Sequence, residues 1–199
     1  MDISAEILDK VRLYALKNEK AERYSHSVRV AQTSEFLCRR YGLDEKKGYF
    51  AGLAHDMCKD LDKEKIMALA EKDGMKIGEL ERKKPSLLHG RAAAVKLNED
   101  FGVDDKEILE AVAFHTFGKD GICDLAKLVF VADKVEPERP QSTEEYRAKL
   151  FALDLNSLVL SVLEENIEYL KAKGKSIAFE TFAFRDYLKK QIDGENKAV

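Results

Sequence analysis

Apolar residues recur every three or four positions along most of the chain, which is the spacing of amphipathic helices. Ile7, Leu8 and Val11 follow this spacing near the start of the sequence, and Val30 and Leu37 follow it in the next segment. Segments that alternate between apolar and polar residues, as half-buried strands do, are few. The pattern therefore predicts an all-α protein, a bundle of about eight to ten helices.

Capping residues, glycines and prolines divide this pattern into separate helices. We expect helices over residues 4–18, 21–41, 45–59, 62–73, 87–101, 105–117, 122–136, 142–153, 154–173 and 179–191. The expected N-caps within this set are Asp44, Asp62, Ser86 and Asp104. Residues 75–85 are expected to form a connecting loop, and Pro137 ends the helix before it because proline cannot continue one.

The charge balance of the chain limits its partners. Lys and Arg number 34 against 37 Asp and Glu, a formal net charge of −3 over 199 residues. This balance argues against bulk attraction to nucleic acid or to an anionic membrane, so any phosphate recognition must be local. The longest charge-free stretch, residues 155–163, is far shorter than the roughly 18 apolar residues of a membrane span.

The first residues and the cysteines favour a reducing compartment. Residues 1–6 are acidic and lack the basic and apolar blocks of a signal peptide, so we expect a cytoplasmic protein. Cys38, Cys58 and Cys123 are far apart and form no C-x-x-C pair, which argues against a disulfide framework and a thiolate zinc site. We expect them to be buried thiols.

The helical pattern directs several polar side chains toward the core. His26 lies one turn before Val30, and His115 follows Val112 at helical spacing. A single buried histidine is more often a hydrogen-bonded core residue than a ligand. Asp133, in an apolar stripe with Val129, is harder to explain because an unpaired buried carboxylate costs several kcal/mol. A bound metal ion would satisfy all these groups.

Four short motifs carry a family resemblance. They are HDMCKDL at 55–61, LLHG at 87–90, HTFG at 115–118 and ADKVEPER at 132–139. Together with His26 they resemble the HD-domain superfamily of metal-dependent phosphohydrolases, and most closely the YqeK-type symmetrical bis(5'-nucleosyl)-tetraphosphatases. The resemblance covers residues from about 20 to 180, nearly the whole chain.

The resemblance implies one HD domain over residues 1–199. Its metal-site core would span about 20–140, and C-terminal helices over about 142–192 would complete the nucleotide pocket. The implied ligands of the first metal are His26, His55, Asp56 and Asp133. His89 and His115 would either complete a second metal site with Asp56 as the bridge or donate hydrogen bonds to phosphate. Iron is the expected metal, as one or two ions, with manganese as a possible substitute; imidazoles and carboxylates without thiolate suit such metals.

The implied reaction is hydrolysis of diadenosine tetraphosphate into two ADP, with Asp56, Lys59, His89 and His115 as the catalytic group. A metal would lower the pKa of a coordinated water from 15.7 toward roughly 7, which makes hydroxide the expected nucleophile. Two other interpretations remain open. The chain could be another HD-domain nucleotidase or phosphodiesterase, or a non-catalytic nucleotide-binding module.

The remaining candidates concern substrate binding. The expected partner is a dinucleoside polyphosphate or an ADP-like nucleotide, and the candidate contacts are Arg23, Lys59, His89, His115, Arg139, Ser176 and Thr181. Ser176 and Thr181 belong to a segment that could equally be an ordinary turn between helices. Asp60 could accept a proton or cap the following helix. A homo-oligomer is compatible with the sequence, which does not decide it.

Overall fold

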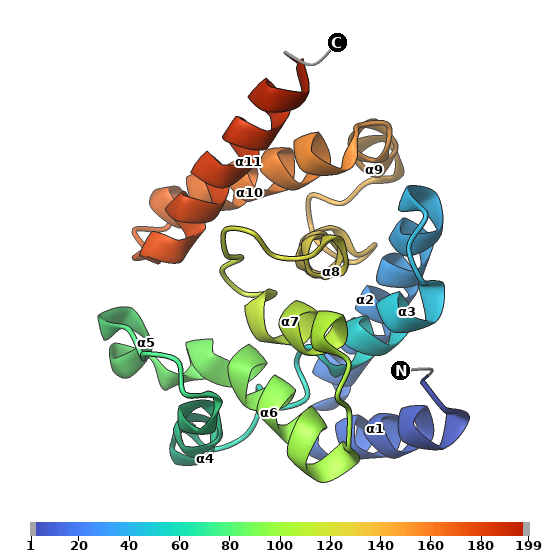
Figure 1. Cartoon of the computed structure of the whole chain (residues 1–199), viewed down its shortest axis with the longest axis vertical. Helices are drawn as coiled ribbons and strands as arrows, with labels where there is room; N and C mark the ends of the chain where they lie inside the picture. The colour runs from blue at the N-terminus through green and yellow to red at the C-terminus, as the bar shows by residue number, and fades with distance from the viewer. Residues whose placement is uncertain (1–2, 197–199) are drawn as a thin grey trace.

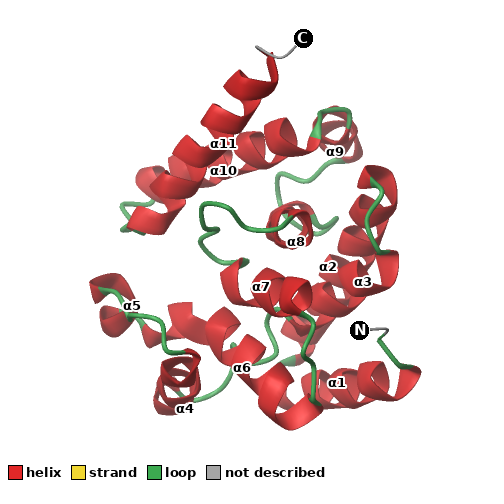
Figure 2. Ribbon diagram, viewed as in Figure 1, coloured by secondary structure: helices red, strands yellow, loops and turns green. Residues whose placement is uncertain are grey.

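Helices make up most of the structure, a computed structural model that describes residues 3–196. The α-helices are α1 (Ala5–Asn18), α2 (Ala21–Tyr41), α3 (Glu45–Ala54), α4 (Lys63–Ala70), α5 (Glu79–Lys83), α6 (His89–Phe101), α7 (Lys106–Phe114), α8 (Asp124–Val135), α9 (Glu144–Phe151), α10 (Leu155–Ala172) and α11 (Phe179–Asn196). Short 3-10 helices span Glu71–Asp73 and Pro85–Leu88. Residues 3–196 contain no strand, which confirms the all-α prediction (Figure 2).

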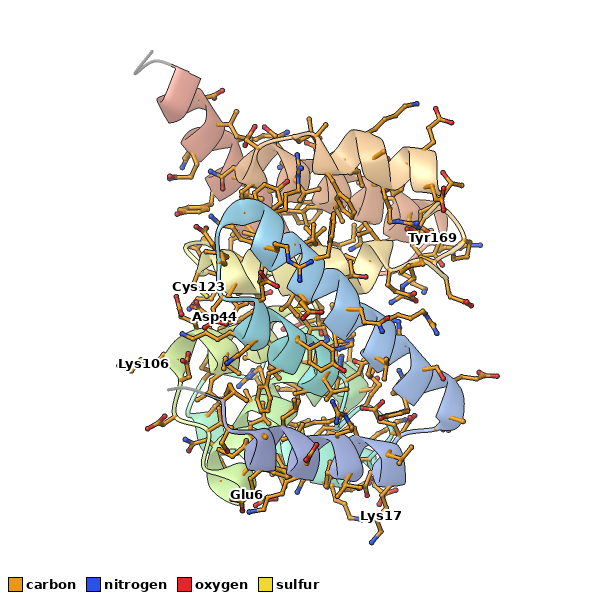
Figure 3. The ribbon with its side chains drawn as sticks, turned by 90° about the vertical axis from the view of Figure 1, so that its right-hand side faces the viewer. Glu6, Lys17, Asp44, Lys106, Cys123 and Tyr169 are labelled. Carbon is orange, nitrogen blue, oxygen red and sulfur yellow. The ribbon has the colours of Figure 1, made fainter. Side chains whose placement is uncertain are left out.

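Helix α8 occupies the centre of the molecule, and this position explains its mostly apolar sequence. Every residue from Leu125 to Ala132 is buried. Figure 1 shows α8 end-on, with α7 beneath it, α2 and α3 to one side and the α10–α11 pair above. Figure 3, from the side, shows the same order from α1 at the bottom to the C-terminal pair at the top, with side chains between the helices. A side chain on α8 can therefore meet residues from most of the fold.

The predicted N-caps Asp44 and Asp62 are correct, although the side chain of Asp62 makes no capping hydrogen bond. Asp44 Oδ1 accepts hydrogen bonds from the N–H groups of Lys46 and Lys47 at 2.9 and 3.1 Å. The prediction for α7 was wrong by one residue, because Asp105 and not Asp104 accepts from the N–H groups at the start of that helix. Ser86 is also not an N-cap, because it lies inside the 3-10 helix that precedes α6.

Helices α3 and α7 both end just before a histidine, earlier than the periodicity predicts. Helix α3 ends at Ala54 instead of near residue 59, and α7 ends at Phe114 instead of 117. In each case the next residue is a histidine whose Nδ1 lies 2.7 Å from the carbonyl oxygen three residues earlier. The backbone then continues in tight turns, so both imidazoles stand at helix ends.

The segment 75–85 was predicted to be a loop, and this was wrong because it contains α5, which brings the number of α-helices in residues 3–196 to eleven. Long-range contacts hold the segment. The buried guanidinium of Arg91 binds both carboxylate oxygens of Asp73 at 2.7 and 2.8 Å and the carbonyl oxygen of Met75 at 2.9 Å. Hydrophobic periodicity carries no sign of such a contact.

One cluster of buried apolar side chains extends through the described chain, from Val11 in α1 to Leu188 in α11. The division of residues 1–199 into a single domain stays a prediction. Within residues 3–196, the structure has no helix with both the length and the apolar content that a bilayer crossing requires. Cys38 and Cys58 are buried, and Cys123 is only partly so.

Candidate metal centre and its cleft

Six side chains that are distant in the sequence meet beside α8. They are His26 from α2, His55 and Asp56 after α3, His89 at the start of α6, His115 after α7, and Asp133 from α8. The Nε2 atom of His89 lies 2.8 Å from Oδ1 of Asp56 and 2.9 Å from Nε2 of His115. On the other side of the group, His26 Nε2 lies 3.0 Å from Oδ1 of Asp133.

The backbone fixes three of the four imidazoles in the same way. The Nδ1 atoms of His55, His89 and His115 lie 2.7, 2.8 and 2.7 Å from the carbonyl oxygens of residues 52, 86 and 112. Because a carbonyl oxygen only accepts, each Nδ1 carries the proton and each Nε2 keeps its lone pair. These lone pairs are directed into the centre, which is the arrangement of metal-ligating histidines.

The fourth imidazole is held by a carboxylate instead. His26 Nδ1 lies 3.0 Å from Oε1 of Glu136, whose other oxygen accepts from Arg29 Nε at 2.6 Å and from the N–H of Glu138 at 2.9 Å. Glu136 is not among the predicted site residues, although it lies in the last motif, three residues after Asp133. A carboxylate that orients a ligand histidine is a common second layer of a metal site.

The donor set fits a divalent metal. The buried Nε2 atom of His55 has no hydrogen-bond partner in the described structure. Its nearest carboxylate oxygens, on Asp133 and Asp56, are 3.7 and 3.8 Å away, too far for hydrogen bonds. A buried polar atom without a partner is costly, and a cation would satisfy it. Imidazole and carboxylate ligands without thiolate suit divalent transition metals.

Two overlapping sets of donors surround Asp56. One consists of His26, His55 and Asp56, the other of Asp56, His89 and His115, and in each set the ligand atoms lie within 4.8 Å of one another. The two oxygens of Asp56 face different partners, since Oδ1 is near His89 and Oδ2 accepts from Arg23 Nη1 at 2.9 Å. A third set, His55, His115 and Asp133, joins the two sides.

Burial and neighbouring charges keep these groups in the forms that bind cations. Burial lowers the pKa of His55 to about 3 and also lowers the pKa values of His89 and His115, so these imidazoles are neutral at pH 7. Burial alone would raise the pKa of Asp56, but His55 and His89 also take up protons at low pH, and their positive charge outweighs burial and holds that pKa well below its usual value. Burial would also raise the pKa of Asp133, but the positive charge of Lys134 helps to hold that pKa well below its usual value.

Three basic side chains border the centre. Arg139 donates from Nη2 to Oδ1 of Asp133 at 2.6 Å, and Lys134 Nζ lies 3.3 Å from Oδ2 of the same carboxylate. On the opposite side, Lys59 Nζ lies 2.9 Å from His89 Nε2. Phosphate oxygens at this centre would meet positive charge on both sides.

The centre opens into a cleft of about 750 Å³. Of the predicted site residues, the cleft is lined by Lys59, His115, Asp133, Arg139, Ser176 and Thr181. Thr181 is buried and donates from Oγ1 to the carbonyl oxygen of Phe117 at 3.2 Å, whereas Ser176 is exposed. The segment that could have been an ordinary turn therefore forms part of the cleft wall.

Arg23 lies beside the centre but outside the cleft. Its guanidinium binds Asp56 and, at 2.7 Å, Asp60, and it is not among the residues that line the cleft. Its contact with substrate stays a prediction. Asp60 does not cap α4, whose N-cap is Asp62; instead it accepts from the N–H of Lys20 at 3.1 Å and joins the start of α2 to the end of α3.

Several cleft residues were missed by the sequence analysis. Lys84 and Lys175 line the cleft and lie near the LLHG motif and next to Ser176, but lysines at such positions are usually surface charge. Tyr169 also lines the cleft and lies far from every motif. Lys134 could have been identified from the sequence as a site residue, because it directly follows Asp133 at the end of an apolar run.

Comparison with known proteins agrees with this geometry. The HD domain family model matches residues 23–138. A protein of Bacillus subtilis named bis(5'-nucleosyl)-tetraphosphatase, symmetrical, is 31% identical over 177 residues, which cover 88% of this chain and 95% of the relative. A Staphylococcus aureus protein of the same name is 33% identical over 133 residues, 66% of this chain and 68% of its own.

A solved structure shows the same fold. The crystal structure of a Clostridium acetobutylicum protein, described as a predicted HD superfamily hydrolase involved in NAD metabolism, superposes with a TM-score of 0.84 at 32% identity. The match covers 92% of this chain and 97% of that protein. From its histidine and aspartate centre, its matched sequence and its fold, the chain belongs to the HD domain family, in the group that includes the symmetrical bis(5'-nucleosyl)-tetraphosphatases.

Proposed function

We propose that the chain is a metal-dependent hydrolase that cleaves diadenosine tetraphosphate symmetrically into two ADP. The observation that carries the proposal is the convergence of four imidazole Nε2 atoms and two carboxylates at the base of a cleft with basic walls. The names of the matched relatives support the substrate class. In the reaction, one water adds across the central P–O bond, and both fragments leave as ADP.

His26, His55, Asp56 and Asp133 would hold one divalent metal ion, and Asp56, His89 and His115 would hold a second. Bound there, the metal would activate water and polarise the phosphoryl oxygens. The proposed metal is iron, with manganese as a substitute, because nitrogen and oxygen donors without thiolate suit both. The unpartnered Nε2 of His55 supports this assignment.

The surrounding basic side chains would stabilise the negative charge that develops on the phosphoryl oxygens. Arg139 and Lys134 reach the cleft beside Asp133, and Lys59 reaches it beside His89. Their fixed positions allow them to bind phosphoryl oxygens of the substrate and the oxygen of the departing ADP without reorganisation, which is the main electrostatic contribution of such sites. Lys134 is held by the carbonyl oxygen of His115 at 3.0 Å.

The test combines metal analysis with product analysis. Protein purified without oxygen is assayed for metal content, stripped with a chelator, and reloaded with Fe²⁺ or Mn²⁺. The loaded protein should convert diadenosine tetraphosphate to ADP alone, and the stripped protein should be inactive. Formation of ATP and AMP, or cleavage of nucleoside monophosphates and cyclic dinucleotides in preference, would contradict the proposal. Tight nucleotide binding without turnover in any metal would indicate a non-catalytic module.

A further inference from the structure

The cleft has two walls that come from different parts of the chain. One wall consists of residues from α10 and the segment before α11, among them Asn166, Tyr169 and Ile177. The other consists of α5 and the 3-10 helix after it, represented by Leu80, Lys84 and Leu87. Figure 1 shows α5 facing the α10–α11 junction on the same side of the molecule. The metal centre, through His115 and Asp133, lies at the base between the two walls.

Positive charge is distributed over both walls and the base. Lys84 stands on the α5 wall, Lys175 on the opposite wall, and Lys59, Lys134 and Arg139 at the base. Lys84 is exposed, and its side-chain ammonium has no hydrogen-bond or ion-pair partner among residues 3–196. A tetraphosphate carries about one negative charge per phosphate, so a chain of phosphates running from one wall to the other would lie among these basic side chains.

The α5 wall also offers apolar surface that the core does not use. Leu80 and Leu87 are half-buried, yet neither belongs to the core cluster of the described chain or to the side chains packed against it. Both line the cleft. Apolar side chains beside a few polar groups are the usual lining of a small-molecule site, and a nucleoside can pack on them.

We propose that Leu80, Lys84 and Leu87 form a half-site for the second nucleoside of a dinucleoside tetraphosphate. This inference rests on the proposed function and adds the position of the substrate. One adenosine would lie on the α10–α11 wall and the other on Leu80 and Leu87, with Lys84 on the nearest phosphates. The central P–O bond would then lie over the metal centre, which explains why cleavage is symmetrical.

The test compares two ligands, one with and one without the second nucleoside. They are diadenosine tetraphosphate and adenosine 5'-tetraphosphate, each with a methylene group in place of the oxygen between the second and third phosphates. Binding to the metal-loaded protein is measured by calorimetry. In the Leu80→Ser/Leu87→Ser variant, affinity for the dinucleoside analogue should fall about tenfold, the effect of losing about 1.4 kcal/mol of apolar contact, whereas affinity for the mononucleoside analogue should change less than about twofold.

Lys84→Ala should lower the affinity for both analogues by about fivefold, because both carry the fourth phosphate. This is the effect of losing one partly exposed charged contact. The matched controls are Lys83→Ala, an exposed lysine of α5 that does not line the cleft, and Leu13→Ser on α1; neither should change binding. Thermal unfolding checks that the double variant is folded. The single variant Leu80→Ala is a milder change that tests the same contact.

An unchanged preference for the dinucleoside analogue in the double variant, or equal weakening of both analogues, would overturn the half-site. Unchanged binding in Lys84→Ala would show that Lys84 is not part of the half-site. These results are separable from the proposed function, which fails if the loaded wild-type protein does not cleave diadenosine tetraphosphate at all.

Discussion

The Nδ1 atom of His26 lies 3.0 Å from Oε1 of Glu136, and this is the one imidazole of the centre whose Nδ1 faces a side chain. The contact fixes the ring so that Nε2 faces Asp133 at 3.0 Å. Arg29 holds Glu136 from the other side. The orientation of a metal-ligating ring therefore depends on a carboxylate outside the ligand set.

Replacing this carboxylate should weaken metal binding without removing a ligand. We expect Glu136→Gln to lower metal affinity by about 10- to 100-fold, the usual effect of losing such a partner. Competition with a chromogenic chelator measures it. Glu138→Gln is the matched control, because Glu138 is exposed and only its backbone N–H contacts Glu136. Equal metal affinity in Glu136→Gln and wild type would show that His26 is not oriented by Glu136.

Two variants should distinguish the residues that bind metal from those that bind phosphate. His55→Ala removes a buried imidazole that belongs to two of the three donor sets, so it should lose bound metal and activity together. Arg139→Ala should keep its metal and raise KM about tenfold, because a charge-assisted contact to phosphate is lost. Elemental analysis and steady-state kinetics give both values. Full activity and full metal content in His55→Ala would contradict the site assignment.

Close packing of α6 on α7 should make Gly90 intolerant of a methyl group. A Cβ there would lie 2.7 Å from the carbonyl oxygen of Val112 and 2.9 Å from His115 Cε1. Gly90→Ala must therefore push α6 away from α7 and displace His115. We expect a loss of about 1–3 kcal/mol in the free energy of unfolding and weaker metal binding.

Denaturant unfolding and metal competition test this prediction. Gly194→Ala on α11 is the control, because a Cβ there meets nothing within 4 Å. If Gly90→Ala and Gly194→Ala unfolded at the same denaturant concentration, the packing argument would be wrong.

Glu19 should make stability depend on pH. Burial raises the pKa of Glu19 from 4.5 to about 7, only partly opposed by the hydrogen bond from Ser27 Oγ at 2.9 Å. The folded state thus binds this proton more tightly than the unfolded state. The resulting stability is present below pH 4.5 and is lost as pH rises toward 7.

Glu19→Gln should remove that loss, so its stability relative to wild type should rise between pH 5 and 8 by at most about 3 kcal/mol. Thermal unfolding at several pH values measures the difference, and the exposed Glu22→Gln serves as the control. A constant difference between Glu19→Gln and wild type over this range would show that Glu19 does not titrate there.

Local signals in the sequence predicted most of the helices. The bounds of α2 are those expected, because Gly42 with φ of 73° ends the helix in a conformation that glycine adopts readily. The ends of α3 and α7 were predicted too late, because a histidine side chain takes the carbonyl that the next turn would need. Helix α5 was missed because distant residues stabilise it.

The candidate centre was predictable for a different reason. An aspartate in an apolar run and histidines on inward helix faces are expensive unless something satisfies them, so His26, His115 and Asp133 stood out. Glu136 had no such signal, since acidic residues near a helix end are common. Leu80, Lys84 and Tyr169 reach the cleft only through tertiary packing, which the sequence does not display.

The peptide carbonyls that hold three of the imidazoles have an evolutionary consequence. A carbonyl oxygen is present whatever residue occupies positions 86 or 112, so substitutions there need not release His89 or His115, provided the helix ends keep their shape. Position 52 is restricted for a different reason, because a Cβ there would lie 2.7 Å from Cα of Ala31. His26 has no such protection, and a single base change at codon 136 can free its ring. Loss of metal during divergence should therefore begin at His26.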